Sequence, residues 1–226
     1  MPQAQLISIQ SGRLFNEIIG YDHIKRLFRM ALDSESAVHI LLEGPPASAK
    51  TMFLTSLMHR LKNSYFADGG SSSKAGMMDY LLTNKPRYLL VDEIDKMTPK
   101  DQVFLLNLME TGIVSETKYG RTRSAEMKTS VFATCNNINK LSSPLQSRFF
   151  IVELEPYTCE QFCQITKQLL SHHNVEEGVT DLIADAVWNK SQDIRDCIRI
   201  GKLARSVEDV GFIVDTFVSK ERKIDE

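Results

Sequence analysis

A run of small residues that ends in lysine and threonine, Gly44-Pro-Pro-Ala-Ser-Ala-Lys50-Thr51, is the segment with the clearest chemistry. It follows the apolar run Val38–Leu42, which predicts a buried strand. A strand that leads into such a loop and then a helix can cradle phosphates, because backbone N–H groups and a helix N-terminus bind anions. We expect Lys50 to reach the β- and γ-phosphates of a nucleotide and the Thr51 hydroxyl to ligate Mg²⁺. The alternative interpretation is an ordinary Gly/Pro turn before a helix.

This loop departs from the usual phosphate-binding pattern at Ala49, where a glycine normally precedes the lysine. Alanine reaches positive φ less readily than glycine, although its backbone N–H remains a donor. We expect the substitution to slow hydrolysis or to alter nucleotide affinity without necessarily abolishing either. The predicted nucleotide-binding residues of the segment are Gly44, Pro45, Ala47, Ser48, Ala49, Lys50, Thr51 and Met52.

Two acidic residues end a second apolar run, Arg87-Tyr-Leu-Leu-Val-Asp92-Glu93. The run predicts a buried strand of a parallel sheet, and ligands of open α/β sheets bind at the carboxyl ends of such strands. We expect Asp92 to hold Mg²⁺ through water and Glu93 to polarise the attacking water, with Lys50 as their catalytic partner. The alternative is that both acids cap a helix, since they precede Ile94–Met97.

The composition is that of an ordinary globular chain. Its 226 residues are 42% hydrophobic and 25% charged, which is enough for one full core and a small additional unit. A net charge of -2 gives no overall attraction to nucleic acid, so any such binding would need a local basic patch. No apolar run is long enough to span a membrane, and the first ten residues lack the features of a signal peptide. We expect a cytoplasmic protein with no membrane partner.

Strand and helix patterns alternate along most of the chain and then give way to helices alone. Residues up to 156 predict an α/β domain, in which helices cover both faces of a parallel sheet. Residues 157–226 predict a small α-helical lid, with helical periodicity over 158–172, 177–190, 193–206 and 207–218. The fold class is therefore a three-layer α/β/α nucleotide-binding domain followed by a helical lid.

Three further polar residues occupy suggestive positions. Asn136 ends the apolar run Ser130–Cys135, where its amide can orient the attacking water. Arg148 lies at a predicted junction between a helix and a strand, and Arg195 opens a helix of the lid. Each of the three is open to another interpretation, as a surface or capping residue.

Taken together and in this order, these segments resemble the AAA+ ATPases, with their Walker A, Walker B, sensor 1, arginine finger and sensor 2 motifs. The resemblance runs from about Phe15 to Val210. A predicted hairpin over 112–128 is similar to the branch that contains RuvB, MoxR, Lon and the MCM helicases. The segments Leu141–Phe149, Glu153–Thr158 and Asp193–Arg205 resemble RuvB, the family of Holliday-junction branch-migration motors.

The resemblance implies roles for several residues. Arg148 would be a finger that acts in trans on the nucleotide of a neighbouring subunit, and Arg195 would contact the nucleotide from the lid. Ile19 and Tyr157 would line the adenine site. ATP would be the substrate, Mg²⁺ its cofactor, and the protein would form a homo-oligomeric ring, which the resemblance implies to be a hexamer. The work would be DNA remodelling of the branch-migration or helicase type.

The predicted hairpin carries four basic residues: Lys118, Arg121, Arg123 and Lys128. These residues would contact DNA phosphates inside a ring. Alternatively, the hairpin would dock an adaptor protein, as the RuvB resemblance implies. The third interpretation is a solvated hairpin with scattered charge. The RuvB family also has a winged-helix DNA-binding domain after its lid, and we expect that domain to be missing here because the predicted lid takes up the sequence to about Val218. Two other functions stay open: a MoxR-like protein remodeller, and a nucleotide-binding switch or scaffold that hydrolyses ATP weakly.

Overall fold

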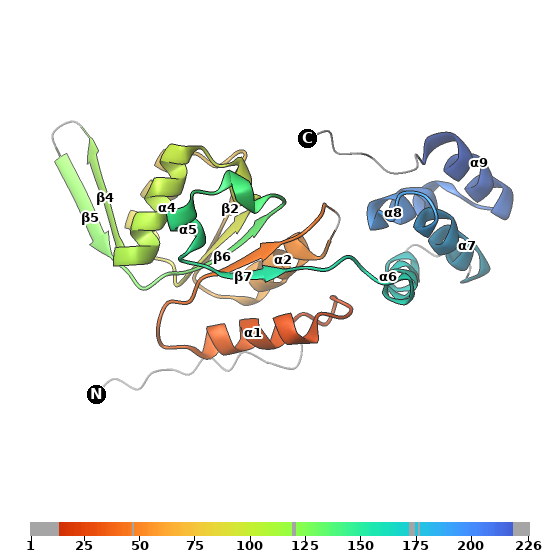
Figure 1. Ribbon diagram of the computed structural model, residues 1–226, viewed down its shortest axis with the longest axis horizontal. Helices are drawn as coiled ribbons and strands as arrows, with labels where there is room; N and C mark the ends of the chain where they lie inside the picture. Colours follow the sequence, from red (N-terminus) through yellow and green to blue (C-terminus); the bar gives the residue numbers. More distant parts are fainter. Residues whose placement is uncertain (1–13, 47, 119–120, 172–174, 176, 219–226) are drawn as a thin grey trace. The chain divides into compact units, whose positions relative to one another are not determined.

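The computed structural model describes residues 14–46, 48–118, 121–171, 175 and 177–218. The chain forms two compact units, Met1–Glu155 and Pro156–Glu226. The first unit contains a parallel sheet with helices on both faces and a separate two-stranded hairpin (Figure 1). The second unit contains helices alone within its described residues.

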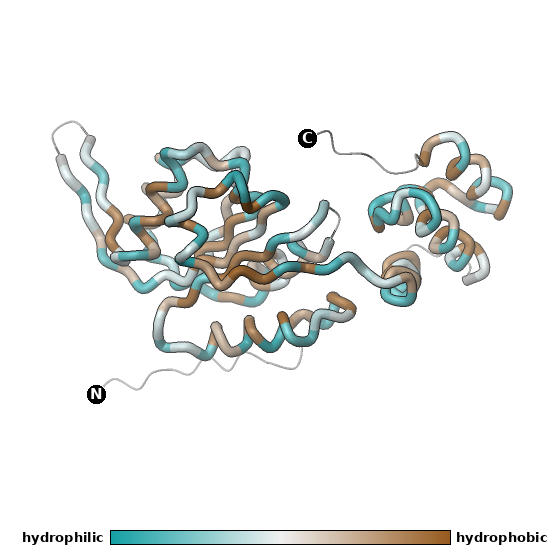
Figure 2. Tube along the Cα trace, in the orientation of Figure 1, coloured by the Kyte–Doolittle hydropathy of each residue, from teal (hydrophilic) through white to brown (hydrophobic). Residues whose placement is uncertain are grey.

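Five strands form the sheet of the first unit, in the order β2-β3-β6-β1-β7, and every neighbouring pair runs parallel. Apolar residues dominate these strands, and Figure 2 colours much of the sheet as hydrophobic. Since parallel strands point the same way, their last residues meet at one edge, where Asp68 pairs in register with Asp92. The strands are β1 (Ile40–Glu43), β2 (Ser64–Asp68), β3 (Tyr88–Asp92), β6 (Ser130–Cys135) and β7 (Phe150–Glu153).

Different helices cover the two faces of the sheet. On one face, Phe28 of α1 packs against Phe53 of α2 and Phe132 of β6. On the other face, Val131 of β6 belongs to the core cluster that also contains Leu105 of α4. The predicted three-layer architecture is confirmed. The helices of this unit are α1 (Asp22–Asp33), α2 (Lys50–Arg60), α3 (Lys74–Asn84), α4 (Pro99–Thr111) and α5 (Ser143–Gln146).

The predicted hairpin is an antiparallel pair, β4 (Ile113–Lys118) and β5 (Arg121–Glu126), next to α4 in Figure 1. α4 ends at Gly112, whose φ of 70° places it in the left-handed region that glycine adopts easily. A Cβ atom at Gly112 would lie 2.6 Å from the carbonyl oxygen of Met127. Glycine is therefore required where α4 turns into the hairpin.

The second unit consists of α6 (Cys159–Ser171), α7 (Glu177–Trp188), α8 (Ile194–Leu203) and α9 (Val207–Phe217). Its core joins Phe162, Ile183 and Val210, which come from three of these helices. α9 begins with a capping box, because the Ser206 hydroxyl accepts the Asp209 N–H and the Asp209 carboxylate accepts the Ser206 N–H. No helix within the described ranges has the length and apolar character that a membrane span needs.

Candidate nucleotide-binding and catalytic site

The loop between β1 and α2 folds back on the lysine that follows it. Lys50 is the first residue of α2. Its Nζ donates hydrogen bonds to the carbonyl oxygens of Gly44 at 2.8 Å and Pro45 at 2.6 Å. It also donates to the Ser48 hydroxyl at 3.1 Å. A Cβ atom on Gly44 would lie 2.9 Å from the carbonyl oxygen of Leu154, so only glycine fits beside the end of β7. The loop thus holds the ammonium group of Lys50 in place through three hydrogen bonds.

Ala49, which stands where the usual phosphate-binding loop has a glycine, adopts an ordinary backbone conformation. Its φ of -69° and ψ of 4° are values that alanine adopts without strain, and its side chain is buried. This conformation does not require positive φ at residue 49, and the effect of Ala49 on hydrolysis and affinity stays a prediction. Ala47 lies outside the described residues, and Met52 is half-buried on α2.

The threonine of the loop and the acid of β3 lie in contact. Thr51 Oγ1 is 3.0 Å from Asp92 Oδ2 and 3.2 Å from Asp92 Oδ1, and it donates to the carboxylate. The Thr134 hydroxyl of β6 donates to Asp92 Oδ1 and accepts the Glu93 N–H at 2.9 Å. Asp92 is only 9% exposed, so these two hydroxyls compensate for the burial of its charge. Hydroxyl and carboxylate oxygens in this arrangement are ligands that suit Mg²⁺.

Glu93 has an unusual backbone and a fully engaged carboxylate. Its φ of 51° and ψ of 49° lie in the left-handed region, a strained conformation that non-glycine residues adopt at functional sites. Its Oε1 accepts a hydrogen bond from Asn136 Nδ2 at 3.3 Å, and its Oε2 forms an ion pair with Lys96 Nζ at 2.5 Å. Glu93 makes no side-chain hydrogen bond as the cap of the 3₁₀ helix Ile94–Lys96. The cap interpretation is therefore wrong for Glu93.

Charges around Lys50 balance its burial. Burial lowers the pKa of Lys50, while Asp92, Asp95 and Glu93 oppose that decrease by favouring the ammonium form. Asp95 is buried and its Oδ1 accepts the Asn136 N–H at 3.3 Å. The carboxyl edge of the sheet thus combines one buried cation with three carboxylates. Such a site suits a ligand that brings both anionic phosphates and a divalent cation.

Arg148 lies outside this cluster. It follows α5, and its Nη2 is 2.6 Å from Oε1 of Glu110, in the last turn of α4. Both side chains are exposed, 41% for Arg148 and 48% for Glu110. An exposed guanidinium is compatible with contact in trans, and that contact is a proposal below.

The remaining predicted nucleotide contacts are distributed over both units. Ile19 is half-buried in the first unit, ahead of α1. Tyr157 and Arg195 belong to the second unit, where Tyr157 packs against the helical core. Arg195 donates from Nε and Nη2 to the carboxylate of Asp193, the N-cap of α8. The roles predicted for these three residues stay predictions.

The basic residues of the hairpin have different surroundings. Arg123 forms ion pairs with Glu116 of the hairpin at 2.7 Å and with Asp79 of α3 at 2.8 Å. Lys128 is exposed. Lys118 and Arg121 pair in register, and their side chains lie outside the described part of the chain, as do Tyr119 and Gly120. Arg123 therefore ties the hairpin to α3.

Three residues with evident roles at these sites were missed by the sequence analysis. Thr134 lies two residues before Asn136, so the alternation of side chains along β6 was a signal that could have found it. Lys96 lies three residues after Glu93, within reach in a single helical turn. Glu110 had no such signal, because its contact with Arg148 joins segments that are distant in the sequence.

Comparisons with known proteins agree with this geometry. One relative is the RuvB subunit of the Holliday junction branch migration complex from Fervidobacterium nodosum, 30% identical over 168 residues, which are 68% of this chain and 48% of RuvB. Another is the DNA replication licensing factor Mcm6 from Drosophila pseudoobscura, 25% identical over 210 residues, covering 74% of this chain and 26% of Mcm6. This chain therefore spans about half the length of that RuvB and a quarter of that Mcm6.

Solved structures of RuvB share the fold. The Thermotoga maritima RuvB Holliday junction branch migration motor superimposes with a TM-score of 0.65 and 26% identity, over 87% of this chain and 69% of that chain. The sequence profile of the ATPase family associated with various cellular activities (AAA) matches residues 40–157. That range covers the loop with Lys50, the acids of β3, Asn136 and Arg148. The chain therefore belongs to the AAA family of ATPases and contains its ATPase domain.

Proposed function

We propose that this chain binds ATP with Mg²⁺ and hydrolyses it as the motor of a homo-oligomeric ring of the RuvB type, hexameric by analogy, which remodels DNA. The observation that carries the proposal is the contact between Thr51 and Asp92, with Glu93 and Asn136 beside it. A hydroxyl, a buried carboxylate, a catalytic carboxylate and a polar amide meet at the carboxyl edge of the sheet. This is where open α/β folds bind their ligands.

Each residue has a distinct task in this mechanism. Lys50 exchanges its contacts with the loop carbonyls for the β- and γ-phosphates, and the backbone N–H groups at the start of α2 bind the same anion. Thr51 and Asp92 would hold Mg²⁺, which supplies charge neutralisation on the phosphates when bound. Glu93 accepts the proton of the attacking water, and Asn136 orients that water against the γ-phosphate.

Two arginines complete the proposed site. Arg148 of one subunit would stabilise the charge that develops on the phosphates bound by its neighbour. Residues 157–226 would act as a lid that brings Arg195 to the nucleotide. Arg195 is paired with the carboxylate of Asp193, and phosphate oxygens would compete with Asp193 for its donors. Arg148 is paired with Glu110 through Nη2, which leaves its other N–H donors available to a phosphate.

DNA is the proposed substrate because the similar proteins named above are a Holliday junction motor and a DNA replication factor. One observation favours a second candidate, the remodelling of proteins. Arg123 is bound by two carboxylates, which removes one of four basic residues from direct phosphate contact and suits a hairpin that docks a protein. The third possibility, a switch that hardly hydrolyses ATP, is less favoured because Ala49 has a backbone conformation that alanine adopts without strain.

Stimulation of turnover distinguishes these functions. ATP hydrolysis would be measured for the assembled protein alone, with linear duplex, and with four-way-junction DNA at low salt. A several-fold rise with the junction supports the DNA motor. Equal turnover under all three conditions, with assembly confirmed by sedimentation, would favour protein remodelling. Tight ATP binding with no turnover under any condition would leave the switch as the function.

A further inference from the structure

We propose that Glu110 is a positioning residue for Arg148: its carboxylate holds the guanidinium in the orientation that reaches the nucleotide of a neighbouring subunit. The inference rests on the proposed function, in which Arg148 acts in trans. It adds a residue of α4 that lies outside the phosphate loop, the β3 acids and the lid.

The backbone that carries Arg148 is fixed to α4. Buried Gln102 of α4 donates from Nε2 to the Lys140 carbonyl at 3.0 Å, and its Oε1 accepts the Ser142 N–H at 2.9 Å. Gln146 of α5 donates to the carbonyl oxygens of Ile138 at 3.0 Å and Leu141 at 2.8 Å. α5 and its flanking turns therefore form a rigid base whose position relative to α4 is set by hydrogen bonds.

The side chain of Arg148 is not fixed by that base. It is exposed, and among the described residues the ion pair that it forms is with Glu110. An arginine side chain has several rotatable bonds, so it populates many rotamers on a surface unless something holds it. Glu110 is the group that restricts Arg148 to one orientation.

The ion pair leaves most of the guanidinium available. A guanidinium carries five N–H donors in a planar fork. Glu110 accepts a hydrogen bond from Nη2 of Arg148. The other edge can donate to a phosphate while the contact with Glu110 persists. For this reason Glu110 orients Arg148 rather than competing with the phosphate.

The location of Glu110 explains why the pair forms. Glu110 lies in the last turn of α4, whose C-terminal end carries partial negative charge. A carboxylate there is unfavourable without a cation nearby, and that turn has no basic residue of its own. Arg148, two residues after the end of α5, supplies the missing positive charge.

A mixed-subunit experiment tests the proposal. The finger donor is a Lys50→Ala protein, which lacks a working site but keeps Arg148; the acceptor is an Arg148→Ala protein, which keeps the site but lacks a finger. Mixing them restores turnover if the finger acts in trans. Adding Glu110→Ala to the donor should lower the restored turnover about two- to fivefold, the range expected for an exposed ion pair. Glu110→Gln in the donor should cost less, since an amide oxygen still accepts.

The same substitution in the acceptor is the decisive control. The acceptor has no Arg148 side chain to position, so Glu110→Ala there should leave the restored turnover unchanged. A merely structural role for Glu110 would lower turnover from either subunit. Glu35→Ala in the donor, at an exposed carboxylate between α1 and β1, should change nothing. Melting temperatures confirm that each variant is folded.

Two failures are distinguishable. If the donor with intact Glu110 restores nothing, although sedimentation shows mixed assembly, the trans role of Arg148 in the proposed function is wrong. If restoration occurs but is the same with Glu110→Ala in the donor, the finger stands and the positioning role of Glu110 is overturned.

Discussion

Glu93 and Lys96 form an ion pair across the 3₁₀ turn that follows β3, with 2.5 Å between Glu93 Oε2 and Lys96 Nζ. Because Asn136 contacts the other oxygen, both oxygens of the proposed catalytic carboxylate are engaged. The hydrogen bond with Glu93 raises the pKa of Lys96, and the negative charge of the same carboxylate raises it further. The ammonium group of Lys96 therefore stays charged at neutral pH. Oε2 must lose this partner, or share it, before it can accept a proton from water.

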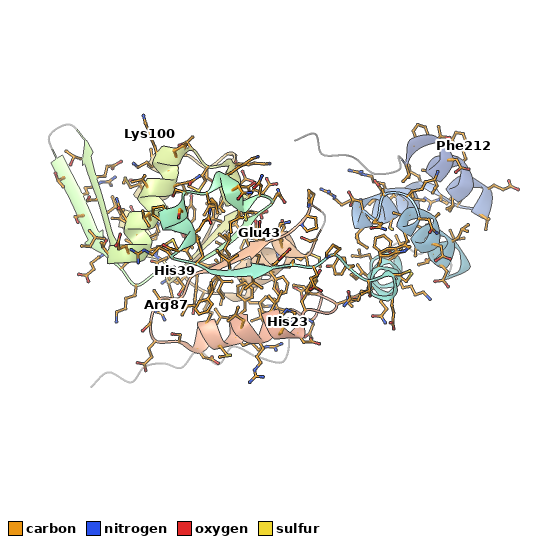
Figure 3. The ribbon with its side chains drawn as sticks, in the orientation of Figure 1. His23, His39, Glu43, Arg87, Lys100 and Phe212 are labelled. Atoms are coloured by element: carbon orange, nitrogen blue, oxygen red, sulfur yellow. The ribbon has the colours of Figure 1, made fainter. Side chains whose placement is uncertain are left out.

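Lys96→Met should therefore raise the kcat for ATP hydrolysis about two- to fivefold, since Lys96 is half-exposed and such pairs are worth little. The KM for ATP should not change, because Lys96 lies outside the phosphate loop. Lys100→Met, at an exposed lysine of α4 labelled in Figure 3, is the matched control and should leave both constants unchanged. A lower kcat in Lys96→Met would mean that the lysine supports the base rather than restraining it.

Glu93→Gln should keep ATP binding and lose turnover by at least about a hundredfold, the range for removal of a general base. Glutamine still accepts the hydrogen bond from Asn136 but cannot accept the proton. Titration with a fluorescent ATP analogue and a phosphate-release assay measure the two properties separately. Retention of wild-type turnover would exclude Glu93 as the base.

Lys50→Ala should weaken ATP binding itself, because it removes the buried positive charge that we propose to contact the phosphates. The same titration measures the loss, with Lys62→Ala as control at an exposed lysine after α2. Unchanged affinity in Lys50→Ala would contradict the assignment of the phosphate loop.

Ala49→Gly, the change toward the usual loop sequence, should lower the free energy of unfolding by about 0.4–1 kcal/mol, because glycine loses more backbone entropy at a φ that alanine already adopts. Turnover should stay within about twofold of wild type, since the peptide N–H is present in both. Chemical denaturation and a steady-state assay check the two parts. A large gain in turnover would show that the nucleotide-bound loop needs positive φ at this position.

Much of this fold follows from local patterns. Thr98 and Pro99 begin α4 as a cap and a first-turn proline should, and Ser130–Cys135 forms the strand that its apolar run predicts. The phosphate loop and the β3 acids were found because their chemistry is encoded in contiguous residues. Spacing along the chain was sufficient there.

The parts that were missed depend on tertiary contacts. The left-handed backbone of Glu93 is fixed by its N–H bond to Thr134 on a neighbouring strand, and nothing local indicates it. The contact of Glu110 with Arg148 and the anchoring of Arg123 to Asp79 likewise join distant segments. One sequence carries no signal for such pairs until the fold places them together.

His39 links stability to pH. Burial lowers the pKa of His39 to about 4, and its Nδ1 accepts the Val131 N–H at 3.1 Å, which requires the neutral ring (Figure 3 labels His39). Between pH 6.5 and 4 the unfolded chain binds a proton that the folded chain does not, so stability is complete above pH 6.5 and falls as pH decreases through this window. We expect a loss on the order of 1–3 kcal/mol for this group.

Denaturant unfolding at pH 7 and pH 5 checks this link, with His39→Gln as the comparison. The variant is expected to be less stable at pH 7 and to lose less stability on acidification than the wild type. Equal pH dependence in the two proteins would show that His39 does not titrate in this window.

We expect Lys128 and Arg123 to contribute differently to the salt dependence of DNA binding. Each phosphate contact contributes a slope of about −0.9 to the dependence of log affinity on log salt concentration. Lys128 is exposed, so Lys128→Ala should reduce the magnitude of the slope by about 0.9 per subunit that contacts DNA. Arg123 is already bound by Asp79 and Glu116, so Arg123→Ala should leave the slope unchanged while loosening the hairpin from α3.

The measurement is a salt series with duplex and four-way-junction DNA, in the presence of a non-hydrolysable ATP analogue that keeps the ring assembled. Loosening of the hairpin by Arg123→Ala should appear as faster amide exchange over β4 and β5, because the ion pair with Asp79 connects the hairpin to α3. A smaller slope in Arg123→Ala would show that the arginine leaves its carboxylates for a phosphate. If the assembled ring binds no DNA even at low salt, the hairpin contacts a protein and the remodelling of proteins becomes the leading function.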